Sequence, residues 1–201
     1  MTSNILLTIG HSTHTSSAFL NILRQHEITA VADVRSIPVS RFTPQFNRDN
    51  VKRGLYGAGI KYVFLGKELG ARTTDATCYV DGRVQYGRLA RTPEFASGIK
   101  RLLQGARTER IAIMCTEQEP LECHRTILIA QVLAEHGVTI DHIHGDGRTE
   151  CHASAMQRLM AKFGLDQDDM LYTPGERLEQ AVSRQERQIA YFNEDFATTG
   201  H

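Results

Sequence analysis

The stretch RIAIMCTEQEPLECHRTILIAQVLAEHGVTIDHI, residues 110–143, decides the fold. It opens with a short apolar run, which is typical of a buried strand, and an amphipathic segment follows as far as His136. A glycine ends that segment, and a second apolar run begins at Val138. Strand, helix and strand in this order predict two parallel strands, because parallel neighbours require a connecting crossover.

The same alternation runs through the rest of the chain. Thr92, Pro93 and Glu94, for example, have the composition of a helix start. We therefore predict an α/β fold in which a parallel or mostly parallel sheet carries helices on both faces, a Rossmann-like three-layer sandwich. The predicted strands occupy residues 4–10, 28–34, 60–66, 110–114 and 138–143, and the predicted helices occupy residues 15–27, 48–59, 92–106 and 121–136.

The chain is expected to form one domain with an appendage. Residues 1–162 make up the predicted single α/β domain, and residues 163–201 make up a C-terminal helical extension and tail. This extension carries Leu178 and Val182 among charged residues, so it either packs on the domain or joins two copies in a homodimer. Residues 66–91 show no periodicity and are predicted to form a long surface excursion that acts as a lid.

Composition and charge exclude several classes of protein. The 23 basic residues balance 23 acidic ones, so the net charge does not indicate a nucleic-acid or anionic-membrane surface. No apolar run approaches the roughly 20 residues that span a bilayer, and the first residues lack the pattern of a signal peptide. We therefore expect a cytoplasmic protein without a membrane partner. In a reducing compartment the four cysteines are expected to be buried, catalytic or metal-bound rather than paired in disulfides.

Reactive side chains follow four of the predicted strands, at the point where each strand ends. Ligands of open α/β sheets bind beyond the carboxyl ends of the strands. The sequence therefore predicts a single site to which several strand exits contribute. The residues at these exits are Gly10, His11 and Ser12, then Asp33, Arg35 and Arg41, then Cys115 and Glu117, and finally His142 and His144.

These exits also carry a family resemblance. The chain resembles the bacterial and archaeal family DUF488, whose function is unassigned, over roughly residues 5–145. The resemblance implies an α/β fold and no particular reaction. The glycine pair common in the family reads Gly70 and Ala71 here. The motifs that carry it are TIGHS at 8–12, DVR at 33–35, PVSRF at 38–42, LGKELGAR at 65–72, CTE at 115–117 and CHR at 123–125.

Two kinds of catalysis are compatible with these residues, and both indicate a hydrolase or a transferase. Cys115 precedes a predicted helix start with arginines nearby, where a thiol can act as a nucleophile. Arg125 is too far along the chain from Cys115 for the compact loop of cysteine phosphatases and rhodaneses. The alternative pairs Glu117 with His11 or His124 as the general acid and base that activate water.

The arginines indicate the chemical class of the ligand. Arg35, Arg41 and Arg125 supply forked donors that match oxyanions, and a helix start adds free backbone N–H groups. Together with Gly10, Ser12 and Asp33 they form the predicted binding set for a small phosphorylated or nucleotide-like ligand. Nucleic acid is a conceivable partner, although the net charge does not indicate it. The competing hypothesis is a non-catalytic module that binds a ligand or nucleic acid through the same arginines.

Helical geometry places side chains within the segment after residue 120. At about 100° per residue, His124 and Arg125 share the apolar side of Leu128, whereas Cys123 points away. A buried Arg125 needs a carboxylate or a bound anion, and Asp33 or Glu117 is the expected protein partner. Of the two cysteines, this geometry favours Cys115 as the functional one.

Metal binding is a third hypothesis, and the spacing of the ligands argues against it. His142, His144, Cys151 and His152 lie close together in the sequence, but their spacing is not that of a zinc finger or ribbon. We therefore predict no metal site, and the sequence identifies no cofactor.

Overall fold

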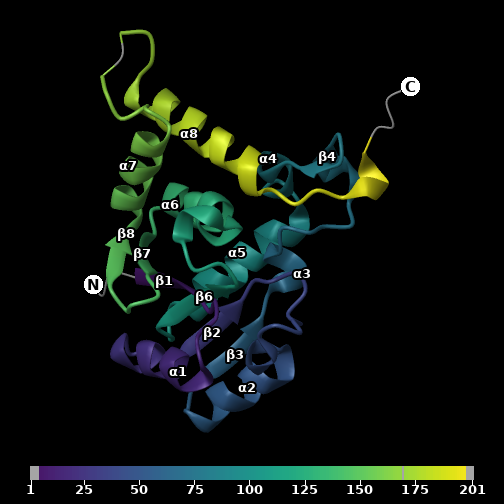
Figure 1. Ribbon diagram of the computed structural model, residues 1–201, viewed down its shortest axis with the longest axis vertical. Helices are drawn as coiled ribbons and strands as arrows, with labels where there is room; N and C mark the ends of the chain where they lie inside the picture. The colour runs from purple at the N-terminus through teal and green to yellow at the C-terminus, as the bar shows by residue number, and fades with distance from the viewer. Residues whose placement is uncertain (1–4, 169, 198–201) are drawn as a thin grey trace.

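The computed structural model describes residues 5–168 and 170–197, and it has the predicted α/β architecture (Figure 1). The main sheet has six strands in the order β3-β2-β6-β1-β7-β8, and only β8 runs antiparallel to its neighbour. Its strands are β1 (Ile5–Gly10), β2 (Ala30–Asp33), β3 (Lys61–Phe64), β6 (Ile111–Cys115), β7 (Thr139–Ile143) and β8 (Thr149–Cys151).

The order of the strands shows where the chain changes direction. After β1 the chain moves outward to β2 and β3, and it then returns to insert β6 between β2 and β1. From β6 it crosses β1 to reach β7 on the other side. The carboxyl end of β6 therefore lies at the switch in strand order, which is where open sheets place their ligands.

Helices cover both faces of the sheet because alternate residues of each strand point to opposite faces. Leu7 and Ile9 pack with Phe19 on the face covered by α1 (Ser16–Gln25) and α2 (Arg48–Gly57). Leu6 and Ile113 belong to the core on the other face. Figure 1 shows α5 (Pro93–Gly105) and α6 (Gln131–Glu135) on that second face.

The segment between β3 and α5 is a packed part of the domain rather than a surface lid. Tyr79 and Tyr86 are only 6% and 3% exposed, and both belong to the core. The prediction that residues 66–91 form a surface excursion acting as a lid is therefore wrong, because these two side chains are buried in the core. Its elements are α3 (Gly66–Leu69), the 3-10 turn η2 (Ala76–Cys78), the hairpin of β4 (Tyr79–Val80) and β5 (Arg83–Val84), and α4 (Tyr86–Leu89).

The crossover after β6 differs from a simple α-helix. A 3-10 turn, η3 (Pro120–Glu122), precedes the π-helix η4 (Arg125–Ala130), which leads directly into α6. Cys123 between them has extended backbone angles, φ −139° and ψ 141°. The helical wheel therefore does not apply to Cys123, and the prediction that it points away is wrong, since the residue is 2% exposed.

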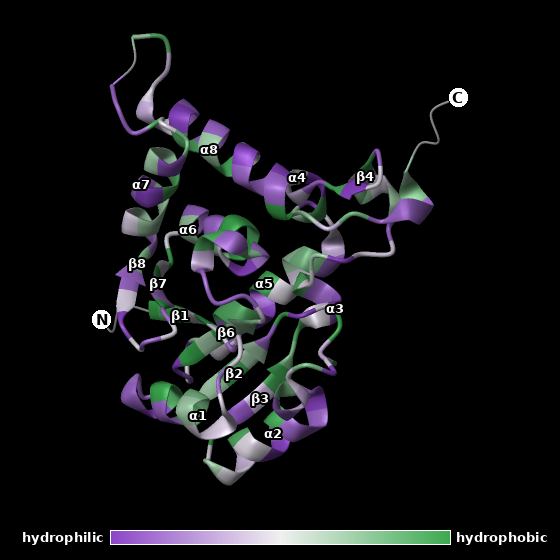
Figure 2. Ribbon diagram, viewed as in Figure 1, coloured by the Kyte–Doolittle hydropathy of each residue, from purple (hydrophilic) through white to green (hydrophobic). Residues whose placement is uncertain are grey.

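The C-terminal extension packs on the domain, which is one of the two arrangements predicted for it. Helix α8 (Pro174–Ile189) begins with a capping box between Thr173 and Glu176, and it contacts α7 (His152–Lys162), η3 and η4. Buried Gln185 donates to the Leu121 carbonyl at 2.9 Å. Figure 2 shows this helix, at the top of the view, as largely hydrophilic. The 3-10 turn η5 (Glu194–Phe196) follows, and the last four residues of the predicted tail lie outside the described residues.

Over the residues that the structure describes, none of the helices combines the length and the apolar character needed to cross a membrane.

Candidate functional site

Three predicted site residues lie side by side at the carboxyl edge of the sheet. Gly10 is in register with Cys115, and Asp33 is in register with Met114 on the next strand. A side chain at Gly10 would collide with the Glu117 carbonyl, so only glycine lets the segment after β6 cross the end of β1. The close approach explains why this strand ends in glycine.

A pocket of about 360 Å³ opens above the end of β6. This volume lies within the range of roughly 300–1,000 Å³ that is typical of small-molecule sites. Its wall is formed by the loop after β2, the start of the segment after α3, the loop after β6 and the end of α8. The lining residues include Arg35, Ser36, Ala71, Arg72, Tyr86, Cys115, Glu117, Glu122, Cys123, His124, Ile189 and Tyr191.

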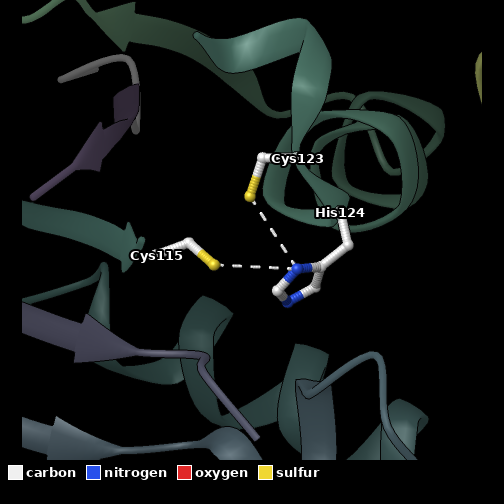
Figure 3. Close-up of side chains that lie close together, drawn as sticks. All are labelled: Cys115, Cys123 and His124. Atoms are coloured by element: carbon white, nitrogen blue, oxygen red, sulfur yellow. Dashed lines mark hydrogen bonds between the residues drawn. The ribbon is translucent and has the colours of Figure 1, made fainter. Parts of the chain in front are cut away.

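Two thiols and an imidazole converge at the floor of this pocket (Figure 3). The Nδ1 atom of His124 lies 3.7 Å from the Sγ atom of Cys115 and 3.8 Å from that of Cys123. The three potential ligand atoms all lie within 4.8 Å of one another. Cys115 comes from the end of β6, whereas Cys123 and His124 come from the start of the helix that returns over the sheet.

The ring of His124 is oriented by the loop after β2. Its Nε2 atom lies 3.2 Å from the Val34 carbonyl, an acceptor, so Nε2 carries the proton in the neutral ring. The lone pair of Nδ1 then faces the two sulfur atoms. Although burial opposes a charge, the hydrogen bond with Cys123 raises the pKa of His124 above its ordinary value.

Glu117 accepts a hydrogen bond from the Cys123 thiol. The residue is exposed at the mouth of the pocket, but its Oε2 atom turns inward and lies 2.9 Å from the Cys123 sulfur. Burial of this carboxylate and the neighbouring Cys123 raise the pKa of Glu117. The hydrogen bond with Cys123, together with burial, raises the pKa of the Cys115 thiol well above its ordinary value. A thiol held in its protonated form is a poor nucleophile, so this environment does not favour Cys115 in that role.

A second network lies beneath the pocket and engages Asp33, Arg35 and His11. Both carboxylate oxygens of fully buried Asp33 accept bonds from the Arg35 guanidinium, at 2.8 and 2.6 Å. Tyr62 also donates to this carboxylate at 2.8 Å, and another Arg35 N–H donates to the Phe46 carbonyl. Most donors of Arg35 are therefore already used within the protein.

His11 is part of this network rather than of the pocket wall. Its Nδ1 atom donates to the Ser12 carbonyl at 3.0 Å, and its Nε2 atom accepts from Arg35 at 3.0 Å. Burial lowers the pKa of His11 to about 4, and the ring stacks on Phe46. Both ring nitrogens are occupied, so the geometry leaves His11 no free lone pair with which to accept a proton from a ligand.

Arg125 is fully buried, as the helical pattern predicts, but neither predicted carboxylate partner pairs with it. Its guanidinium donates to the backbone carbonyls of Glu117 at 2.6 Å and Gln118 at 3.1 Å. The expected ion pair with Asp33 is wrong because Arg35, two residues away on the same loop, already saturates that carboxylate. Arg125 therefore fixes the course of the segment that carries Glu117.

Other predicted residues lie away from the pocket. Exposed Arg41 stacks on Phe42, and Ser12 continues the ladder between β1 and β6 by donating its N–H to the Thr116 carbonyl. His142 is buried between Thr8 and His152, whereas His144 pairs with Glu150. These contacts place His142 in the packing between the sheet and α7, and His144 in the turn between β7 and β8.

Sequence reasoning did not include Arg72, Tyr86 or Tyr191 in the predicted site, and it misjudged Cys123. Arg72, Tyr86 and Tyr191 come from segments without periodicity or from the extension, and only tertiary packing brings them to the pocket. Cys123 was assigned to the wrong side of its segment. The pair Cys123 and His124, adjacent in the sequence and following Cys115, was the one available indication that the two cysteines converge.

Fold and site together define a mostly parallel α/β protein with a thiol-, imidazole- and carboxylate-bearing pocket at the carboxyl edge of its sheet. The family model described as "Domain of unknown function DUF488" matches residues 15–132. The chain belongs to this family, as the resemblance predicted. No curated protein and no solved structure matches the chain.

Proposed function

We propose that the protein is an enzyme that binds a small anionic ligand of nucleotide size in this pocket and acts on it by hydrolysis or group transfer. The observation that carries the proposal is the convergence of Glu117, His124 and two thiols on the floor of one pocket. Proton-transferring groups with perturbed pKa values, gathered in a cleft at the switch in strand order, are characteristic of enzyme sites.

Arg72 is the best-placed receptor for the anionic part of the ligand. Its guanidinium lies 4.6 Å from the centre of the Tyr191 ring, and no carboxylate among residues 5–168 and 170–197 forms an ion pair with it. Its forked N–H groups are therefore available to an oxyanion. Arg35 lines the same wall and adds positive potential, although Asp33 offsets most of it.

Glu117 is the residue we assign to proton transfer. Its carboxylate belongs to a residue that lines the pocket, and it contacts the Cys123 sulfur. Arg125 holds the backbone of Glu117 in place through a hydrogen bond to its carbonyl. A carboxylate positioned in this way can accept a proton from water or from a ligand hydroxyl. Tyr86 and Tyr191 offer ring surface to the remainder of the ligand, such as a nucleobase.

A thermal-shift series with phosphate, nucleotides and nucleosides tests ligand binding. A ligand that binds only the folded state raises Tm by mass action. We expect the rise with a phosphorylated ligand to be lost in Arg72→Gln and kept in Arg91→Gln, a matched exposed arginine outside the pocket. No rise with any of these ligands at millimolar concentration would overturn the proposal.

Turnover separates an enzyme from the competing non-catalytic module. With a substrate identified among the stabilising ligands, Glu117→Gln should lower kcat by about 100-fold or more. Glu122→Gln is the matched control, because Glu122 also lines the pocket but points to Lys162. A ligand that binds through Arg72 without any turnover would favour the non-catalytic module.

A further inference from the structure

We propose that Cys115, Cys123 and His124 bind one zinc ion at the floor of the pocket. The three residues supply two sulfur atoms and one nitrogen atom that lie within 4.8 Å of one another. Figure 3 shows the three side chains pointing toward a common point between β6 and the helix that follows. Metal binding here does not require the anionic ligand proposed above.

The distances between the atoms fit a tetrahedral ion. With Zn–S near 2.3 Å and Zn–N near 2.0–2.1 Å, sulfur and nitrogen ligands lie roughly 3.6 Å apart. The measured separations of His124 Nδ1 from the two sulfur atoms are 3.7 and 3.8 Å. The ligands therefore need only small side-chain adjustments to surround the ion.

The surroundings of His124 are those of a metal ligand. A histidine that binds a metal through one ring nitrogen generally donates its other N–H to a carbonyl or carboxylate, which fixes the ring. His124 Nε2 is bonded in this way to the Val34 carbonyl at 3.2 Å, and Nδ1 faces both sulfur atoms. A packing histidine has no need to present a lone pair to two thiols at once.

The cluster also provides for the charge of the ion. Two thiolates neutralise a divalent cation, and the Arg125 backbone N–H lies 3.5 Å from the Cys123 sulfur as a donor. On binding, the two thiol protons leave to solvent as two Zn–S bonds form, so the step involves no oxidation or reduction. Soft thiolate ligands with an imidazole favour zinc over magnesium or calcium.

Three protein ligands leave a fourth position on the ion. The cluster lines the pocket, and the Glu117 carboxylate lies beside it, 2.9 Å from the Cys123 sulfur. Structural zinc sites have four protein ligands, whereas catalytic ones keep a position open for water or substrate. The ligand set and its place in the pocket correspond to the open arrangement.

The rival explanation of this cluster is that the two buried thiols only form hydrogen bonds with the histidine and bind no metal. On oxidation, two such thiols can also form a disulfide. Both alternatives can be tested on the full-length wild type. The protein, purified with a reductant, is stripped with a chelator, titrated with zinc against a chromogenic chelator, and in parallel loaded with cobalt(II). We expect about one metal per chain, a rise in Tm with zinc, and thiolate-to-cobalt charge transfer with tetrahedral d–d bands.

Variants then assign the ligands. Cys115→Ser, Cys123→Ser and His124→Ala should each weaken zinc binding at least about tenfold and remove or shift the cobalt bands. Cys78→Ser and Cys151→Ser, the other buried thiol and the exposed one, should bind as the wild type does. The proposal is overturned if the wild type takes up no zinc and gives no thiolate band with cobalt. This result does not depend on whether the variants fold. Equal binding by the ligand variants and the controls overturns it too.

Discussion

The guanidinium of Arg125 donates to the backbone carbonyl of Glu117 at 2.6 Å, and this contact links the crossover helix to the loop that bears the proposed acid–base group. A second bond reaches the carbonyl of Gln118 at 3.1 Å. The arginine is fully buried, and its charge faces carbonyl dipoles rather than a carboxylate. We infer that Arg125 positions the pocket loop, because its guanidinium donates to the backbone of that loop and not to a ligand.

Arg125→Leu should lower the free energy of unfolding by about 3 kcal/mol, because two carbonyls lose charge-assisted hydrogen bonds in the interior. Adding Asp33→Asn should not restore stability, since Asp33 is not the partner of Arg125. Arg148→Leu is the control, because Arg148 is 84% exposed and pairs only with Asp146 at the surface. Urea unfolding of the four proteins decides the matter. Recovery in the double variant would instead reveal a direct charge coupling.

Gly10→Ala should destabilise the protein by about 1–3 kcal/mol, because its methyl group would overlap the Glu117 backbone. Gly54→Ala is the matched control. Gly54 lies in α2 on the surface with open space around it, so alanine there should stabilise by up to about 1 kcal/mol. Opposite signs of the two changes in chemical unfolding are the expected result, and equal effects would contradict the close approach at β1.

The fold and part of the site could be predicted because they depend on regular periodicity. Parallel strands end at the same edge, so Gly10, Asp33 and Cys115 had to lie near one another once the strands were identified. The apolar stripe of the crossover segment likewise placed His124 and Arg125 inside. These inferences use only the repeat of helix and strand, which is a local property of the chain.

The remaining parts depend on irregular backbone and long-range packing. Cys123 turns inward because its extended conformation precedes a π-helix, and no periodic pattern encodes that junction. Arg72 and Tyr191 meet across the pocket only because the C-terminal segment returns to the domain. The partners of Arg125 could not be predicted, because every residue has a backbone carbonyl and the sequence does not indicate which of them accepts a hydrogen bond.

Asp33→Asn should cost about 3–5 kcal/mol of folding stability, since it leaves the Arg35 charge without its partner in the interior. The exposed pair of Asp146 and Arg148 offers a control of the same chemistry, and Asp146→Asn should cost at most about 1 kcal/mol. Thermal and urea unfolding of both variants measures the contrast. Comparable losses at the two sites would mean that burial does not set the strength of these pairs.

The cysteines should differ sharply in reactivity toward a disulfide reagent such as DTNB. Cys151 is exposed, and hydrogen bonds from Ser154 lower the pKa of its thiol, so it should react at once in the native protein. Cys78, Cys115 and Cys123 are buried and should react only on unfolding. The absorbance of the coloured thiolate that DTNB releases gives the number of thiols that have reacted. Cys151→Ser should abolish the rapid phase of this reaction. A rapid phase that persists in that variant would show that the pocket thiols are open to reagents.

Stability should fall as pH drops below about 6.5, because three buried histidines resist protonation in the folded state. Burial lowers the pKa of His11 and that of His152 to about 4, and that of His142 to about 3, from the ordinary value of 6.5. Above that ordinary value all three rings are neutral in either state, and no stability is lost. Below it the unfolded chain binds protons that the folded protein excludes, so each histidine contributes a slope of up to about 1.4 kcal/mol per pH unit until its folded pKa is reached.

His142→Gln should remove one of these contributions, which unfolding in urea at about pH 6 and about pH 5 would reveal as a shallower slope. Thr8→Val is the control, because it deletes the hydrogen-bond partner of His142 Nδ1 but leaves the titrating ring. That variant should be less stable at both pH values with the slope of the wild type. A slope in His142→Gln as steep as that of the wild type would mean that His142 takes up a proton as readily in the folded protein as in the unfolded chain, contrary to its burial between Thr8 and His152.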